Sequence, residues 1–176
     1  MALFLRIAEK KHNVPGLKME HITSYALEEC LPISREVIAD IVEELIHGTH
    51  DEPLPPVPGA AGVLSEVAEA AAPLLFVTAR PKKGPILEWV LKTLDLDEAS
   101  VDVEATGSFE AKTRVLLDAG KTWFVEDRLE TCFLLQDAGI SPVVFARPWN
   151  RKPHPFCEVA SWEELRGLLD LFPGQP

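Results

Sequence analysis

PLLFVTARP (residues 73–81) is the stretch that decides the fold. Between its two prolines lie five apolar or β-branched residues, Leu74 to Thr78, and helix-forming sequence follows. A short, continuous apolar run of this kind is typical of a strand buried on both faces of a parallel sheet. Open α/β sheets bind ligands beyond the carboxyl ends of their strands, so we expect Thr78 and Arg80 to lie at a ligand-binding edge.

A second buried strand with a polar end is predicted at residues 122–126. There an apolar run leads into Glu126 and Asp127. Two adjacent carboxylates repel each other unless a cation lies between them, and oxygen ligands suit Mg²⁺, which also takes substrate phosphates. The alternative is an acidic start for the next helix, whose dipole favours carboxylates. The pair by itself leaves both interpretations open.

Strands and helices alternate from Gly59 onward. This alternation indicates βαβ units, and therefore an α/β fold with a doubly wound parallel sheet. A last helix is expected to begin at Ser161, with Glu164 in capping-box register and apolar residues as far as Phe172. The other helices are expected at about 60–71, 83–95, 109–119 and 128–138, and the strands at 74–78, 101–103, 122–126 and 140–146.

The first third of the chain is predicted to be helical and separate. One amphipathic helix covers Met1 to about Asn13, and a second runs from an N-cap at Ser34 to Gly48. The four prolines of DEPLPPVPG (51–59) form a stiff connector. We therefore expect a helical segment over residues 1–55 and an α/β core over residues 56–176.

Composition and charge exclude several classes of partner. The net charge of −11 argues against nucleic acid polymers and anionic membranes, which attract basic surfaces. No apolar run approaches the ~20 residues that span a bilayer, and the N-terminus lacks the pattern of a signal peptide. Three scattered cysteines without CxxC spacing fit reduced thiols and a cytoplasmic location.

Two further groups are candidates for binding phosphate. The Thr78 hydroxyl and the Ala79 amide could hold a phosphate oxygen, although a threonine before a proline also serves as an ordinary turn residue. Lys112 falls in the first turn of a predicted helix, where a cation opposes the helix dipole unless an anion binds nearby. The alternative for Lys112 is a solvated surface side chain.

Taken in order, these groups resemble the haloacid dehalogenase superfamily of phosphohydrolases. FVTAR (76–80) is similar to its second motif, Lys112 within AKT to its third, and VEDR (125–128) to its fourth. Within that superfamily, PVPGA (56–60) and RPWN (147–150) resemble the 5′(3′)-deoxyribonucleotidase group. The resemblance implies a Rossmannoid core with a small helical cap. It also implies Mg²⁺-dependent hydrolysis of a small phosphorylated metabolite, a nucleoside monophosphate, through an aspartyl-phosphate.

The resemblance also implies roles for individual residues. Thr78 and the Ala79 amide would hold phosphoryl oxygens, Lys112 would offset their charge, and Asp127 with Glu126 alongside would bind Mg²⁺. Arg80 either touches phosphate or pairs with a surface acid. Cap residues choose the substrate in such enzymes, so a sugar or polyol phosphate is an alternative to a nucleotide.

The first motif of that superfamily, a strand ending in DxD that carries the nucleophile, is missing from this chain. Asp95-Leu96-Asp97 has the right letters but is expected at a helix end, without a strand before it. The missing strand would lie between those at 74–78 and 122–126. Its absence would leave the facing edges of these two strands unpaired. Either the natural protein begins some 15–20 residues upstream, about one strand and its loop, or the chain is an inactive remnant. Such a remnant would bind a phosphorylated ligand or a partner protein.

Overall fold

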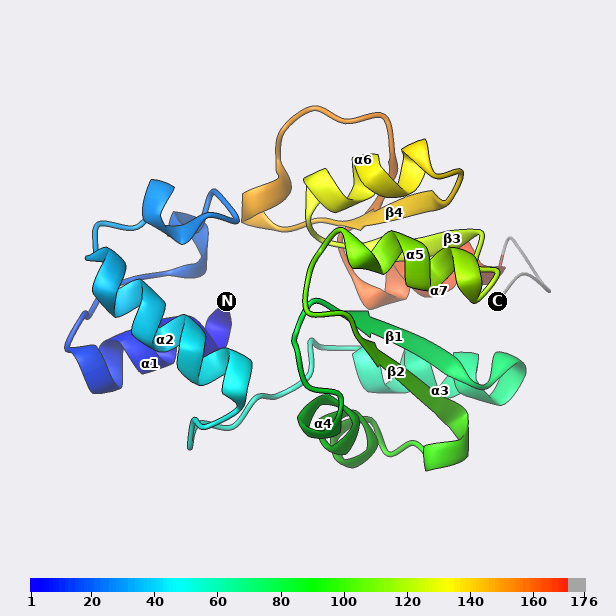
Figure 1. Cartoon of the computed structure of the whole chain (residues 1–176), viewed down its shortest axis with the longest axis horizontal. Coiled ribbons are helices and arrows are strands. Elements are labelled where there is room, and N and C mark those ends of the chain that lie inside the picture. Colours follow the sequence, from blue (N-terminus) through cyan, green and yellow to red (C-terminus); the bar gives the residue numbers. More distant parts are fainter. Residues whose placement is uncertain (171–176) are drawn as a thin grey trace. The chain divides into compact units, whose positions relative to one another are not determined.

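The protein is a mixed α/β chain that forms two compact units in a computed structural model, which describes residues 1–170 (Figure 1). Met1–Leu54 and Arg147–Pro153 make up the first unit. Pro55–Ala146 and the chain from His154 onward make up the second. The RPWN loop therefore packs with the helical N-terminal part, although it lies within the sequence range expected for the core. Among the described residues no helix is long and apolar enough to cross a membrane.

The first unit contains the two predicted helices. In α2 the Ser34 hydroxyl accepts the Val37 backbone N–H at 3.3 Å, and Gly48, with φ of 67°, ends the helix in the left-handed region. Short 3₁₀ helices, which the sequence did not predict, occupy the connections because three-residue turns leave no periodic pattern. The elements are α1 (Ala2–His12), η1 (Met19–His21), η2 (Leu27–Glu29), α2 (Arg35–His47) and η4 (Pro148–Asn150).

The second unit alternates helices and strands as predicted, and all its strand pairs are parallel. Two predictions need correction. The strand expected at 101–103 continues for two more residues. A short strand at Cys157–Val159 was missed, because Cys157 and Glu158 are polar and exposed. Phe172, expected in the last helix, lies outside the described residues. The elements are α3 (Ala60–Ala71), β1 (Leu74–Thr78), α4 (Gly84–Leu94), η3 (Glu98–Ser100), β2 (Val101–Ala105), α5 (Ala111–Asp118), β3 (Trp123–Glu126), α6 (Leu129–Asp137), β4 (Ser141–Phe145), β5 (Cys157–Val159) and α7 (Trp162–Asp170).

The strands of this unit form two sheets instead of one. Their orders are β1-β2 and β3-β4-β5, and within the described chain β1 and β3 do not pair with each other. In the first sheet Leu74 lies opposite Val101 and Thr78 lies opposite Ala105. The parallel α/β class is thus confirmed, while the single expected sheet is present as two halves.

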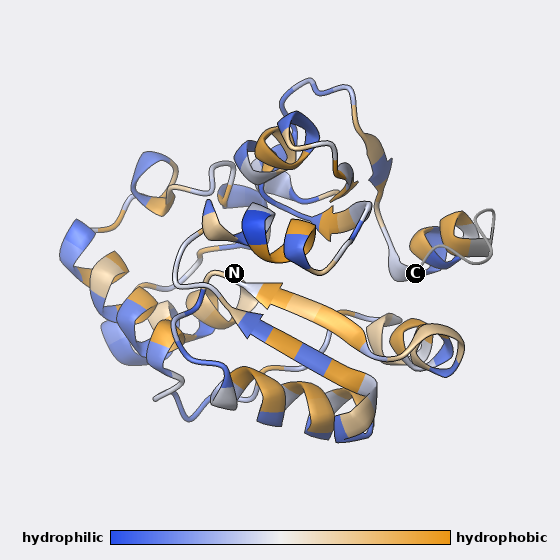
Figure 2. Ribbon diagram, turned by 45° about the vertical axis from the view of Figure 1, so that its right-hand side comes forward, coloured by the Kyte–Doolittle hydropathy of each residue, from blue (hydrophilic) through white to orange (hydrophobic). Residues whose placement is uncertain are grey.

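Helices cover both faces of these sheets, and one helical layer is shared. Val77 of β1 and Phe124 of β3 both pack into the cluster around Leu116 of α5 and Leu135 of α6. On the opposite face of the first sheet, Val103 packs against α3 and α4, and the alternation of apolar and acidic residues along β2 is visible in Figure 2. The apolar layer under α5 and α6 is therefore continuous where the backbone pairing is interrupted.

Two neighbouring leucines on α5 test this packing. Leu116 is 1% exposed and Leu117 is 47% exposed. Leu116→Ala should lower the free energy of unfolding by about 2–5 kcal/mol, because it leaves a cavity in the shared layer. Leu117→Ala should change it by less than about 0.5 kcal/mol. Urea unfolding measures both, and equal effects would contradict the packing described here.

Candidate active site

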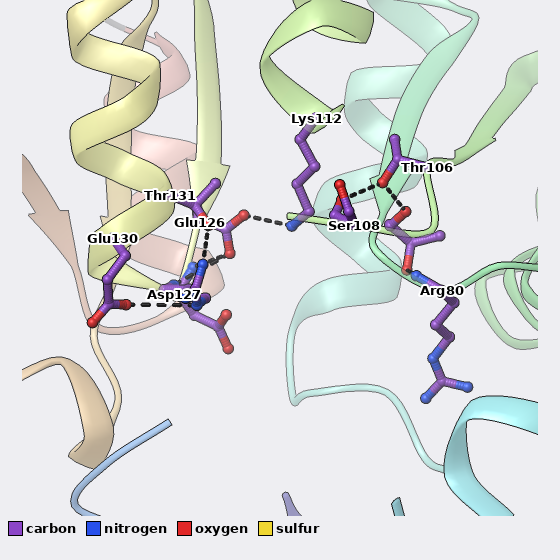
Figure 3. Close-up of polar contacts among 10 residues, drawn as sticks. Arg80, Thr106, Ser108, Lys112, Glu126, Asp127, Glu130 and Thr131 are labelled. Carbon is purple, nitrogen blue, oxygen red and sulfur yellow. Dashed lines mark hydrogen bonds and ion pairs between the residues drawn. The ribbon is translucent and has the colours of Figure 1, made fainter. Parts of the chain in front are cut away.

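Both sheets present the carboxyl ends of their strands at one polar edge. Lys112 lies in the first turn of α5, after β2, and its ammonium donates a 2.6 Å hydrogen bond to Glu126 at the end of β3 (Figure 3). Thr78 ends β1, and its carbonyl accepts the backbone N–H of Thr106, just after β2, at 2.8 Å. The structure therefore brings Thr78, Lys112 and Glu126 to the same edge, and Asp127 follows directly.

The loops after β1 and β2 are tied together by hydroxyl groups. The Thr106 hydroxyl lies 2.9 Å from the Thr78 carbonyl and 2.6 Å from the Ser108 carbonyl, so its one proton can go to either. The Ser108 hydroxyl accepts the backbone N–H of Ala111, the first residue of α5, at 3.2 Å. Sequence reasoning missed Thr106 and Ser108, because the strand was expected to end at Val103. The signal in the sequence was the polar Thr-Gly-Ser run at 106–108, which directly follows the observed end of β2 at Ala105.

Thr78 makes the contact of a turn residue. Its hydroxyl accepts the backbone N–H of Arg80 at 3.2 Å, which stabilises the turn that contains Ala79. This contact uses a lone pair of the oxygen and leaves the hydroxyl proton to be donated. The Arg80 side chain extends away from Lys112 and Glu126 (Figure 3). The turn role of Thr78 is therefore observed, and it is compatible with binding an anion.

The Lys112–Glu126 ion pair is buried. The two side chains are 9% and 5% exposed, so a solvated surface lysine is the wrong interpretation of Lys112. The second carboxylate oxygen of Glu126 accepts the backbone N–H groups of Asp127, at 3.0 Å, and Arg128, at 3.2 Å. Both oxygens of Glu126 are therefore used by the protein itself. Burying two charges is expensive unless such additional hydrogen bonds satisfy them.

Adjacent carboxylates point in different directions. Glu126 faces the Lys112 ammonium, whereas the Asp127 side chain is directed away from it (Figure 3). Within residues 1–170 no three His, Cys, Asp or Glu side chains are grouped so that they could hold a metal ion. Mg²⁺, however, is often bound by one or two carboxylates, with water and substrate phosphate as its other ligands. The carboxylates of Asp127 and Glu126 both offer the oxygen atoms that Mg²⁺ takes, and those of Glu126 also accept from Lys112 and from two backbone N–H groups.

Charged groups of both signs lie at this edge. Arg80, Lys112 and Arg128 are basic, and Glu126, Asp127 and Glu130 are acidic; Glu130 lies 3.6 Å from the Arg128 guanidinium.

The Asp95-Leu96-Asp97 sequence is far from this edge. Asp95, with φ of 54°, ends α4, and Asp97 precedes η3, just before β2 begins. Both residues thus lie toward the amino ends of the strands, and the prediction of a polar helix terminus is confirmed. Among the described residues, Asp127 is the aspartate that directly follows the carboxyl end of a strand, and no other does.

Cys132 lies buried in α6, close to the acidic pair. Burial, followed by the charges of Glu126 and Asp127, raises the pKa of this thiol from 9.0 to about 12. The group is therefore protonated at neutral pH and is not a nucleophile.

The chain matches no model of a known protein family, and no curated protein is similar enough to it to count as a match.

Breaking the buried ion pair should destabilise the protein strongly. Lys112→Met or Glu126→Gln alone should each cost about 3–5 kcal/mol, because the remaining group is left uncompensated. The double variant should recover much of that loss. Arg114→Ala is the matched control, since it removes an exposed ion pair to Asp118 on the same helix, worth at most about 0.5 kcal/mol. Urea unfolding of the four variants measures their free energies of unfolding. If the single variants at Lys112 and Glu126 lose no more than Arg114→Ala, the ion pair is not buried as described.

The three thiols should differ in reactivity. Cys157 is exposed, Cys30 is partly buried and Cys132 is buried. At pH 8 a thiol reagent such as DTNB should label Cys157 fast, Cys30 more slowly and Cys132 only after unfolding, because Cys132 is both inaccessible and protonated. Peptide mass analysis of the labelled protein identifies each site. Fast labelling of Cys132 in the folded chain would contradict its placement.

Proposed function

We propose that this chain provides the core of a Mg²⁺-dependent phosphomonoester hydrolase of the haloacid dehalogenase type, with nucleoside monophosphates as substrates. The observation that supports this best is the buried Lys112–Glu126 pair at an edge shared with Thr78 and Asp127. These residues occur along the chain in the order of the second, third and fourth motifs of that superfamily. In this proposal the α/β unit is the Rossmannoid core, and the helical unit is its cap.

Each residue has a distinct role in the proposal. The Thr78 hydroxyl and the Ala79 N–H donate to phosphoryl oxygens, and the Lys112 ammonium offsets their negative charge. Glu126 acts through Lys112, because it holds the ammonium at the edge and also fixes the turn that carries Asp127. Asp127 holds Mg²⁺, which takes substrate phosphate among its other ligands.

The nucleophile requires a strand that the described residues do not contain. β1 and β3 share a helical layer but no backbone hydrogen bonds, so a parallel strand between them would satisfy both edges. Its carboxyl end would lie between Thr78 and Glu126. An aspartate there would attack phosphorus, and a second acid two residues on would protonate the departing alcohol oxygen. The same acid would then take a proton from the water that hydrolyses the aspartyl-phosphate.

A second candidate function is binding of a phosphorylated ligand or of a partner protein without hydrolysis. It is favoured by one observation: no aspartate other than Asp127 follows the carboxyl end of a strand in residues 1–170. In that case the chain would bind a phosphate group through Thr78 and Lys112 but would not hydrolyse the phosphate ester.

The genomic sequence directly upstream of Met1 separates these functions. We expect an in-frame apolar segment that ends in DxD, and we expect the extended protein to hydrolyse nucleoside monophosphates when Mg²⁺ is present. Asp127→Asn in that protein should lower kcat/KM by about 10²-fold or more, since metal ligation is weakened. Asp118→Asn, on the exposed face of α5, should leave the rate unchanged.

The other outcomes are equally informative. An in-frame stop codon before any such segment would favour binding without hydrolysis. If sugar or polyol phosphates are hydrolysed faster than nucleoside monophosphates, the substrate class in the proposal changes to those esters. If neither class of ester is hydrolysed with Mg²⁺ present, the enzymatic proposal fails.

A further inference from the structure

An aromatic ring lies against two of the basic side chains of the polar edge, Lys112 and Arg128. The ring of Phe109, in the loop before α5, has the Arg128 guanidinium carbon 4.3 Å from its centroid and the Lys112 ammonium nitrogen 5.8 Å from it. Cations within about 6 Å of a ring centroid are attracted by the negative face of the ring. Phe109 therefore contacts a cation from each of two helices.

Both cations stand where the helices themselves disfavour them. Lys112 is the second residue of α5, and Arg128 is the N-cap of α6. The positive end of each helix dipole repels a cation there, typically by about 0.3–1 kcal/mol. The face of the Phe109 ring provides attraction of the same order for each group. The Phe109 ring therefore lies beside a cation at the N-terminal end of each of two helices, where its negative face offsets the repulsion by the helix dipole.

Glu126 and Phe109 act on the same two residues. One oxygen of Glu126 accepts from the Lys112 ammonium and the other accepts the Arg128 backbone N–H. Glu126 thereby neutralises Lys112, and a bound anion must compete with it for the ammonium. The Lys112 ammonium makes this 2.6 Å hydrogen bond while lying 5.8 Å from the ring centroid of Phe109 and 5.9 Å from that of Phe124.

We propose that Phe109 is a positioning residue of the anion site. Its ring holds Lys112 and Arg128 at the carboxyl edge of the strands, so that their positive charge is available to a phosphate. Phe109 itself touches no ligand. The inference rests on the proposed function and adds to it the residue that sets the cations in place.

Fluorination of the ring tests this role without changing its shape appreciably. Phenylalanines with one, two and three fluorine atoms, incorporated at position 109 of the full chain, weaken the negative face of the ring step by step. The probe is inorganic phosphate in the presence of Mg²⁺, with binding measured by titration calorimetry. Affinity should fall with each fluorine, to about 3- to 10-fold below that of the unsubstituted chain, which matches a cation–π contribution.

Phe133 provides the matched control. It lies on α6, is 43% exposed, and its ring packs edge-on against Phe156 at 4.8 Å. The same series at position 133 should leave phosphate affinity unchanged. Suppose that the unsubstituted chain binds phosphate and that fluorination at position 109 changes the affinity as little as fluorination at position 133. That result would overturn the role of Phe109 and leave the proposed function standing. If the unsubstituted chain binds no phosphate, the proposed anion site and this inference both fail.

Discussion

The buried ion pair between Lys112 and Glu126 is the polar link between the two halves of the α/β unit. Lys112 belongs to α5, whose Leu116 packs against β1, whereas Glu126 ends β3. Because β1 and β3 share no backbone pairing in the described chain, this contact joins them at the edge where ligands of parallel sheets bind. The cost of burying two charges is offset only because Glu126 also accepts two backbone N–H groups.

The two strands of the first sheet, β1 and β2, differ in the charges that they carry. The outer strand β2 carries Asp102 and Glu104, and the Lys83 ammonium lies near both. Charges on an edge strand discourage pairing with another strand. β1, in contrast, has no charged residue between Leu74 and Thr78. Uncharged strands of this kind are typical of the interior of a parallel sheet.

Two adjacent acids have different surroundings. Glu126 accepts from the Lys112 ammonium and from two backbone N–H groups of the turn that follows, so it organises the edge. Asp127 is directed away from that pair (Figure 3) and is the residue that holds the cation in the proposed function. The proposed role of Phe109 concerns the same edge, because its ring lies against Lys112 and Arg128.

The sequence by itself determined the order and the approximate bounds of the main helices and strands. The helix at 60–71 and the strand at 74–78 lie at the predicted residues, because apolar periodicity, prolines and capping residues act over a few neighbours. It also singled out Thr78, Lys112, Glu126 and Asp127, since each is a polar residue at the end of an apolar strand or at the start of a helix.

Only the tertiary structure decided what these residues do to one another. Lys112 and Glu126 are 14 positions apart, and no local pattern shows that they form a buried pair. The bridging role of Thr106, the division of the sheet and the contact of Phe109 with Arg128 were equally hidden. Each of these depends on a distance between separate segments, which packing sets and which the spacing of residues along the chain does not.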